Sequence, residues 1–265
     1  SGKQTTAVTE TAIGKTRYDL QTNQSVQNRL VVYPDGTIGA AFTFGLAEAA
    51  FADRGTGYNY FTGSAWGAQP TSRVETARCG WPSYDDFGAG EFLVTHNGST
   101  GLLVSTRAAK GTGAWTQQTL VGPVTSDGST ALLWPRAITN GNTIHIIACT
   151  NQEASGSPAI AYKGLHLALV YIRSTNGGAT WDAPVILPGM DSASVITTMV
   201  DGFGGDSYAW ADPVGNTIAF VYGDQWSGLF IQKSTDNGNT WNKINVFQVP
   251  DFTTFPTDTF YTIDQ

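Results

Sequence analysis

The stretch Ser234-Thr235-Asp236-Asn237-Gly238-Asn239-Thr240-Trp241 decides the fold of this 265-residue chain. It follows an apolar run, Leu229 to Ile231, and leads into a second strand-like segment. A short Asp side chain accepts hydrogen bonds from the backbone N–H groups of a turn, and glycine takes up a positive φ without strain. The tryptophan offers a large apolar surface to a neighbouring sheet. The stretch therefore predicts a hairpin turn with a structural rather than a catalytic role.

A near copy of this turn lies at 174–181, with Asn176 in the place of the aspartate. The structural positions of the two turns are Ser174, Asn176, Gly178 and Trp181, and Ser234, Asp236, Gly238 and Trp241. Trp66 and Trp115 follow two further glycine-bearing turns, and strand-like runs precede all four tryptophans. A unit that recurs in this way predicts a repeat architecture.

The pattern Ser-x-Asp-x-Gly-x-Thr-Trp resembles the Asp-box of sialidase-like (BNR-repeat) β-propellers. The resemblance implies an all-β fold, a β-propeller of four-stranded antiparallel blades with Asp-box turns. Four blades are recognisable, whereas about six are usual in that family, so the chain is expected to be part of a larger ring. The same box occurs in enzymes and in non-catalytic surface proteins, so the resemblance does not choose a function.

The repeat divides residues 28–250 into four blades, at about 28–78, 79–132, 133–206 and 207–250. Residues 1–27 are polar and are expected to supply a closing strand, and residues 251–265 to begin a further unit or a tail. An open arc of blades leaves sheet surfaces unpaired, which is an aggregation liability. Further domains of a longer chain, or other subunits, are therefore expected as partners.

Charge and composition exclude several classes of partner. The formal net charge of -7 argues against nucleic acid, which is also anionic. No apolar stretch approaches the roughly 20 residues that span a bilayer, so membrane insertion is not expected. With three scattered histidines and no Cys-x-x-Cys pair, we expect no metal and no cofactor. A disulfide between Cys79 and Cys149 stays open, because it requires Cα atoms within about 7 Å of each other.

In a propeller the first strand of each blade lies nearest the axis, and the loops that enter these strands converge on one rim. Trp-Pro pairs at 81–82 and 134–135 mark two such entries. The candidate ligand-binding residues at these entries are Arg29, Arg78, Trp81, Trp134, Arg136, Trp210 and Asp212. A tryptophan at the same place in each blade is also typical of packing between blades, so that alternative stays open.

Three functional interpretations compete. A sialidase would use three arginines, here Arg29, Arg78 and Arg136, to bind a substrate carboxylate, with a Tyr–Glu pair beside them. The sialidase Arg-Ile-Pro motif is missing, and no glutamate has a clear place opposite a tyrosine. A general glycosidase needs two facing carboxylates, for which the candidates by position are Asp85, Asp86, Asp212 and Asp224. A carbohydrate-binding site needs only exposed aromatic rings with polar neighbours.

We therefore predict a non-catalytic binding or structural module, with a glycan or a protein as ligand. A sialidase-like glycoside hydrolase is the alternative, and we assign no catalytic residue. Residues 54–61 and 134–137, with the two boxes, resemble secreted surface proteins of Bacteroidota that are exported by type IX secretion. This resemblance implies a secreted or cell-surface location.

Overall fold

The computed structural model describes residues 10–22, 28–150, 162–194, 207–224 and 228–248, and its regular elements are all β-strands. These are β1 (Leu30–Val32), β2 (Ile38–Phe44), β3 (Gly55–Phe61), β4 (Gly80–Phe87), β5 (Gly90–His96), β6 (Leu102–Arg107), β7 (Thr116–Leu120), β8 (Leu132–Asn140), β9 (Thr143–Thr150), β10 (Leu169–Ser174), β11 (Tyr208–Trp210), β12 (Ile218–Asp224), β13 (Gly228–Ser234) and β14 (Asn242–Gln248). Within the described ranges no helix is long and apolar enough to cross a membrane.

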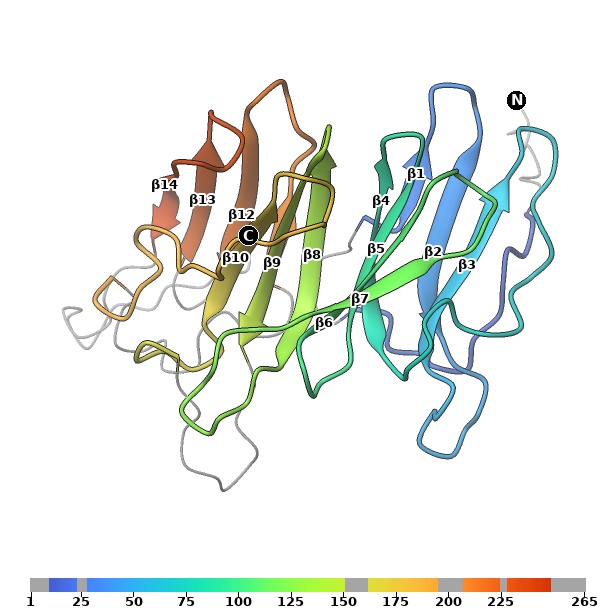
Figure 1. Ribbon diagram of the computed structural model, residues 1–265, viewed down its shortest axis with the longest axis horizontal. Helices are drawn as coiled ribbons and strands as arrows, with labels where there is room; N and C mark the ends of the chain where they lie inside the picture. Colours follow the sequence, from blue (N-terminus) through green and yellow to red (C-terminus); the bar gives the residue numbers. More distant parts are fainter. Residues whose placement is uncertain (1–9, 23–27, 151–161, 195–206, 225–227, 249–265) are drawn as a thin grey trace, which may run out of the picture.

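The strands form four antiparallel sheets in chain order: β1-β2-β3, β4-β5-β6-β7, β8-β9-β10 and β11-β12-β13-β14. In the third sheet Val185 pairs with Tyr171 of β10 through backbone hydrogen bonds of 2.8 and 2.9 Å, so residues after the turn lie where a fourth strand would. The sheets stand side by side in a row, from β1–β3 at one end to β11–β14 at the other (Figure 1). This is the predicted β-propeller architecture of antiparallel blades.

Apolar side chains fill the junctions between neighbouring sheets. Phe92 and Val94 of β5 meet Ile144 and Ile146 of β9 between the second and third sheets, and all four are fully buried. A second cluster joins the third sheet to Tyr208, Phe220 and Phe230 of the fourth. Alternate residues of each strand serve opposite faces, because side chains in a strand point up and down in turn. The central strands β5 and β9 therefore each contribute side chains to two clusters.

The tryptophan after each turn packs as the fold requires in three of the four sheets. Trp115 lies edge-on to Tyr58 of the first sheet, with ring centroids 5.7 Å apart. Trp181 packs on the cluster between the second and third sheets. Trp241 lies edge-on to Tyr171 of the third sheet at 4.9 Å. Trp66 instead contacts Phe61 of its own sheet, because no sheet precedes the first among the described residues.

The two turns that predicted the fold share one hydrogen-bond pattern. The Gly238 N–H donates to Ser234 Oγ at 2.8 Å, and the Thr240 N–H donates to Asp236 Oδ1 at 2.8 Å. In the earlier turn, the Gly178 N–H donates to Ser174 Oγ at 2.8 Å and the Thr180 N–H to Asn176 Oδ1 at 2.9 Å. An asparagine oxygen thus replaces the carboxylate oxygen without loss of the bond to the backbone.

We expect the substitution Asp236→Asn to weaken the fold at neutral pH and to have little effect near pH 2. Hydrogen bonds from the Thr240 hydroxyl, the Thr240 N–H and the Ser234 hydroxyl lower the pKa of Asp236 to about 2. Because the folded pKa lies below the usual 3.8, the charge stabilises the fold above about pH 4 and this contribution is lost as the pH falls towards 2. Thermal unfolding midpoints of both proteins from pH 2 to 7 measure the effect. A difference in midpoint that is the same at every pH would contradict it.

The described part of the N-terminal segment, residues 10–22, contains no strand. It lies against the first sheet instead: the Thr43 N–H donates to Gln21 Oε1 at 2.8 Å, and Asn59 Nδ2 donates to Ile13 O at 2.6 Å. Residues 10–22 thus form no closing strand, and for the rest of the segment the closing strand stays a prediction. The side chains of Gln21 and Asn59 make these bonds between the segment and the sheet, in place of a strand ladder. Residues 1–9 and 23–27 of that segment, and 251–265, lie outside the described residues.

Candidate functional site

The first residues of β4 and β8 lie at one edge of the sheets, here named the entry rim, which is the lower edge in Figure 1. Trp81 and Trp134 both take a positive φ there, +52° and +49°. The strand register shifts at both places, between Gly80 and Ser83 and between Leu133 and Arg136. Each Trp-Pro pair therefore forms a bulge, which fits a proline that cannot donate to the ladder.

His96 joins the two bulges. Its ring is stacked on Trp81 with centroids 5.0 Å apart, and its Nδ1 accepts the Trp134 N–H at 2.8 Å. Burial and the nearby charges of Arg54 and Arg78 lower the pKa of His96 to about 3. The imidazole is thus neutral at physiological pH and acts as a packing and hydrogen-bonding link between the second and third sheets.

The other face of Trp81 is also covered. The Arg54 guanidinium lies 5.3 Å from the Trp81 ring centroid, and the Tyr18 ring lies edge-on at 6.1 Å. Arg54 is held by bonds from Nε to Cys79 O at 2.8 Å and from Nη1 to the Tyr18 hydroxyl at 3.1 Å. Trp81 is only 7% exposed, so these contacts favour the packing role over a sugar-stacking one.

Two of the three candidate arginines, Arg29 and Arg78, bond to different parts of the chain. Arg29 donates to the side chain and carbonyl of Gln21. Arg78 donates to the carbonyl oxygens of Phe51 at 3.0 Å and Ala50 at 3.2 Å. Arg136 is buried in β8, 1% exposed. Whether the three guanidinium groups bind one carboxylate, as in a sialidase, stays a prediction.

Trp210 and Trp134 also have protein partners. The Trp210 indole N–H donates to Arg136 O at 3.0 Å, and its ring lies edge-on to Phe220 at 4.9 Å. The Trp134 carbonyl accepts the Tyr208 hydroxyl at 2.7 Å. Asp212 is exposed just after β11. Trp210 is the last residue of β11 and Asp212 follows that strand, so their place on one ligand-binding rim with Trp81 and Trp134 stays a prediction.

One glutamate does lie opposite tyrosines, which corrects the expectation from the sequence. Glu91 accepts hydrogen bonds from the hydroxyls of Tyr58, Tyr84 and Tyr33, and it forms an ion pair with Arg107. Burial raises the pKa of Tyr58 and of Tyr84. The carboxylate is 0% exposed, so this cluster closes the junction between the first and second sheets and does not face a ligand.

The remaining acidic candidates also make contacts between strands. Asp85 Oδ2 accepts the Thr139 N–H of β8 at 2.8 Å, and Asp86 O accepts the Thr139 hydroxyl at 2.6 Å. Burial and the charge of Asp86 raise the pKa of Asp85 to about 7, against the hydrogen bond from Thr139. The side chain of Asp224 lies outside those that the structure describes.

The two cysteines do not form a disulfide. Both are buried free thiols: Cys79 directly precedes β4 and Cys149 lies in β9, and burial raises the pKa of Cys79. Cys149 Sγ lies 3.6 Å from the Tyr208 hydroxyl. The spacing of the two cysteines along the chain could not decide this, because pairing depends on where they lie in the folded protein.

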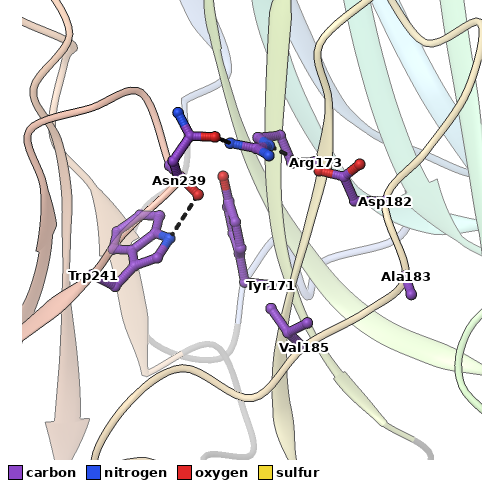
Figure 2. Close-up of a pocket in the computed structure, with 8 residues that line it drawn as sticks. Tyr171, Arg173, Asp182, Ala183, Val185, Asn239 and Trp241 are labelled. Carbon is purple, nitrogen blue, oxygen red and sulfur yellow. Dashed lines mark hydrogen bonds and ion pairs between the residues drawn. The ribbon is translucent and has the colours of Figure 1, made fainter.

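A pocket of about 190 Å³ opens where the third and fourth sheets meet, at the turns after β10 and β13. It is lined by Tyr171, Arg173, Asp182, Ala183, Val185, Gly238, Asn239 and Trp241. Figure 2 shows Trp241 and Asn239 on one side of Tyr171, and Asp182, Ala183 and Val185 on the other. Strand β10, the segment after its turn and the quoted turn of the fourth blade thus build one site.

The polar side of the pocket is organised around Arg173. Its Nε donates to Asp182 Oδ2 at 2.9 Å, and its Nη1 donates to Asn239 Oδ1 at 2.8 Å and to Asn237 O at 3.3 Å. The Arg173 side chain is 16% exposed and that of Asp182 is 55% exposed. The guanidinium is therefore fixed in place, while the carboxylate stays accessible to a ligand.

The apolar side is held equally firmly. The Tyr171 hydroxyl bonds to His145 Nδ1 at 2.7 Å, and His145 Nε2 lies 3.1 Å from Asn237 Oδ1. Burial, aided by the charge of Arg173, lowers the pKa of His145 to about 4, so this imidazole is neutral at pH 7. The Trp241 indole N–H donates to Gly238 O at 3.2 Å, which fixes the ring beside the pocket.

Sequence reasoning missed Tyr171, Arg173 and Asp182 as site residues. One signal was present: Arg173 directly precedes one box and Asp182 directly follows its tryptophan. The two are nine residues apart and come together because 174–181 forms a tight turn. The box was assigned a structural role, so its flanking residues were not considered.

Comparison with solved structures places the fold among known ones. The chain resembles Zg3597, a family 117 glycoside hydrolase produced by the marine bacterium Zobellia galactanivorans, with a TM-score of 0.50 and 13% identity over 87% of this chain and 72% of that one. The chain also resembles a protein of unknown function from Dyadobacter fermentans, with a TM-score of 0.50 and 12% identity over 86% of this chain and 73% of that one. A third similar structure is the ulvan lyase of polysaccharide lyase family PL25, with a TM-score of 0.50 and 10% identity over 85% of this chain and 57% of that one.

No protein-family model and no curated protein matches the chain. At 10–13% identity, the structural likeness establishes the fold alone. The chain is therefore an all-β protein of β-propeller architecture.

Proposed function

We propose that this protein is a secreted or cell-surface β-propeller module that binds carbohydrate without cleaving it. The observation that carries the proposal is the pocket between the third and fourth sheets, in which aromatic rings stand beside a fixed guanidinium and an accessible carboxylate. Sugars present C–H faces and hydroxyl edges, and a site with one aromatic side and one polar side matches both. The glycoside hydrolase and the polysaccharide lyase named above act on carbohydrate, which supports the same class of ligand.

The contacts of the acidic residues support binding rather than hydrolysis. Hydrolysis of a glycosidic bond needs two carboxyl groups about 5–10 Å apart around the bond. Asp182 is the carboxylate that lines this pocket, and it pairs with Arg173. Glu91, Asp85 and Asp236 are bound to groups within the fold. Release of product from fluorogenic glycosides or sialosides would favour the alternative, a glycoside hydrolase of sialidase-like architecture.

The outward face of the last sheet supports a partner beyond the glycan. Leu229 and Phe247 are register partners there, 43% and 58% exposed, and Ile244 is 42% exposed. Apolar side chains that gather on an exposed sheet commonly mark a contact surface. Further domains of a longer chain, or other subunits, stay part of the proposal.

We expect the substitution Asn239→Ala to weaken glycan binding by about tenfold. It removes the acceptor that holds Arg173 Nη1 in the pocket, and a hydrogen bond to a charged group is worth roughly 1.5–3 kcal/mol. A glycan array followed by calorimetry on the best ligand measures the loss. The matched control is Asn245→Ala, because Asn245 is an exposed residue of β14 that bonds only to Gln248 within the described residues. Equal losses in both variants, or no glycan bound at all, would contradict the proposal.

A further inference from the structure

We propose that the pocket binds a single neutral pyranose through two adjacent hydroxyl groups, one donating to Asp182 and the other accepting from Arg173. The inference rests on the proposed function and adds the chemical class of the sugar. It follows from the size of the pocket, its charge and the hydrogen-bonding groups that the protein itself leaves for a ligand.

Size limits the ligand to about one ring. The pocket holds about 190 Å³, below the roughly 300–1,000 Å³ of sites for drug-sized ligands. Trp241 lies on one side of Tyr171 and Val185 on the other (Figure 2), so a bound ring would have apolar neighbours among the lining residues. Longer glycans would place one residue in the pocket and leave the others outside.

Charge argues for a neutral sugar. The lining contains one guanidinium and one carboxylate, which are paired, and His145 behind Tyr171 is neutral. A uronate or other acidic sugar would bring a second carboxylate beside Asp182, and like charges at that distance repel. The net charge of the chain, -7, adds a long-range repulsion of the same sign.

The hydrogen bonds of Arg173 also favour a neutral sugar over an acidic one. A carboxylate is bound best by two parallel N–H donors of one guanidinium. Nε of Arg173 is taken by Asp182, and Nη1 by Asn239 and Asn237. Among the described residues, Nη2 of Arg173 and Oδ1 of Asp182 make no further hydrogen bond. The ion pair holds the Arg173 donor and the Asp182 acceptor next to each other, so they can bind two neighbouring hydroxyl groups of one sugar.

The test compares methyl glycosides of neutral hexoses with the methyl glycoside of glucuronic acid, by ligand-observed NMR and calorimetry. We expect the neutral sugar to bind at least tenfold more tightly than the uronate. Removal of either of two adjacent hydroxyls, in deoxy analogues, should weaken binding about tenfold each, and removal of a distant hydroxyl should not.

The variant Asp182→Asn should weaken the neutral glycoside about tenfold and reduce its advantage over the uronate, because the like-charge repulsion is gone. Asp19→Asn is the control: Asp19 is exposed on the N-terminal segment, and both variants should unfold at the same temperature as the parent. Tighter binding of the uronate than of the neutral sugar would overturn this inference and leave carbohydrate binding intact. Absence of binding by every sugar would overturn both.

Discussion

Replacement of Glu91 by alanine is expected to lower the free energy of unfolding by about 3–5 kcal/mol. The carboxylate is fully buried and pairs with Arg107, whose side chain is 6% exposed. The substitution leaves a positive charge in the junction between the first and second sheets, together with the hydroxyls of Tyr58 and Tyr84, which lose their acceptor. Removal of one member of a buried pair costs far more than the pair itself contributes, because the remaining charge has no partner.

Urea and thermal unfolding, followed by tryptophan fluorescence, measure this effect. For a chain of this size the loss corresponds to a fall in Tm of roughly 6–20 °C. The control is Glu48→Gln, which breaks an ion pair with Arg17 whose side chains are 60% and 70% exposed, and it should shift Tm little. Equal shifts in the two variants would show that the Glu91 cluster is not a stabilising element of the junction.

The second large effect is expected for Gly238→Ala. Gly238 has φ +84°, and an added Cβ would lie 2.1 Å from the Tyr171 hydroxyl and 3.2 Å from His145. The residue would have to displace the Tyr171–His145 hydrogen bond that holds one side of the pocket. We expect about 1–2 kcal/mol from the backbone conformation and roughly 1–3 kcal/mol more from overpacking.

Gly36→Ala separates these two contributions. Gly36 has nearly the same φ, +81°, and nothing lies within 4 Å of the added Cβ. Its variant should therefore lose only the part due to backbone conformation and keep glycan binding, whereas Gly238→Ala should lose both stability and binding. Chemical unfolding and sugar titration of the two variants test this. If Gly36→Ala proves as damaging as Gly238→Ala, then close packing against Tyr171 is not the cause.

The fold could be predicted from the sequence because its signals are local. Each turn is encoded within eight residues, and the bonds of Asp236 to Thr240 and of Ser234 to Gly238 are made inside that window. The tryptophan that follows each turn packs against the neighbouring sheet, and the repeat in the sequence predicts that sheet. The all-β architecture of antiparallel sheets and the two turns could therefore be predicted.

The site could not be predicted in the same way because its contacts cross between blades. Glu91 meets Tyr58 from a position 33 residues away, and Arg173 meets Asn239 from 66 residues away. Trp81 looked available for stacking, but Tyr18 and Arg54, both distant in sequence, cover it. Which rings are exposed depends on tertiary packing, and no spacing along the chain records it.

The row of sheets bears on how such a protein changes over evolutionary time. The main packing between sheets joins neighbours in chain order: β2 with β4, β4 with β8, and β8 with β11. In linear repeats, the total energy is close to a sum over units and nearest-neighbour interfaces. A change in the third sheet, which contains β8, therefore affects its interfaces with both neighbouring sheets. The pocket is built from residues of two adjacent sheets, so it is kept only where both are inherited together.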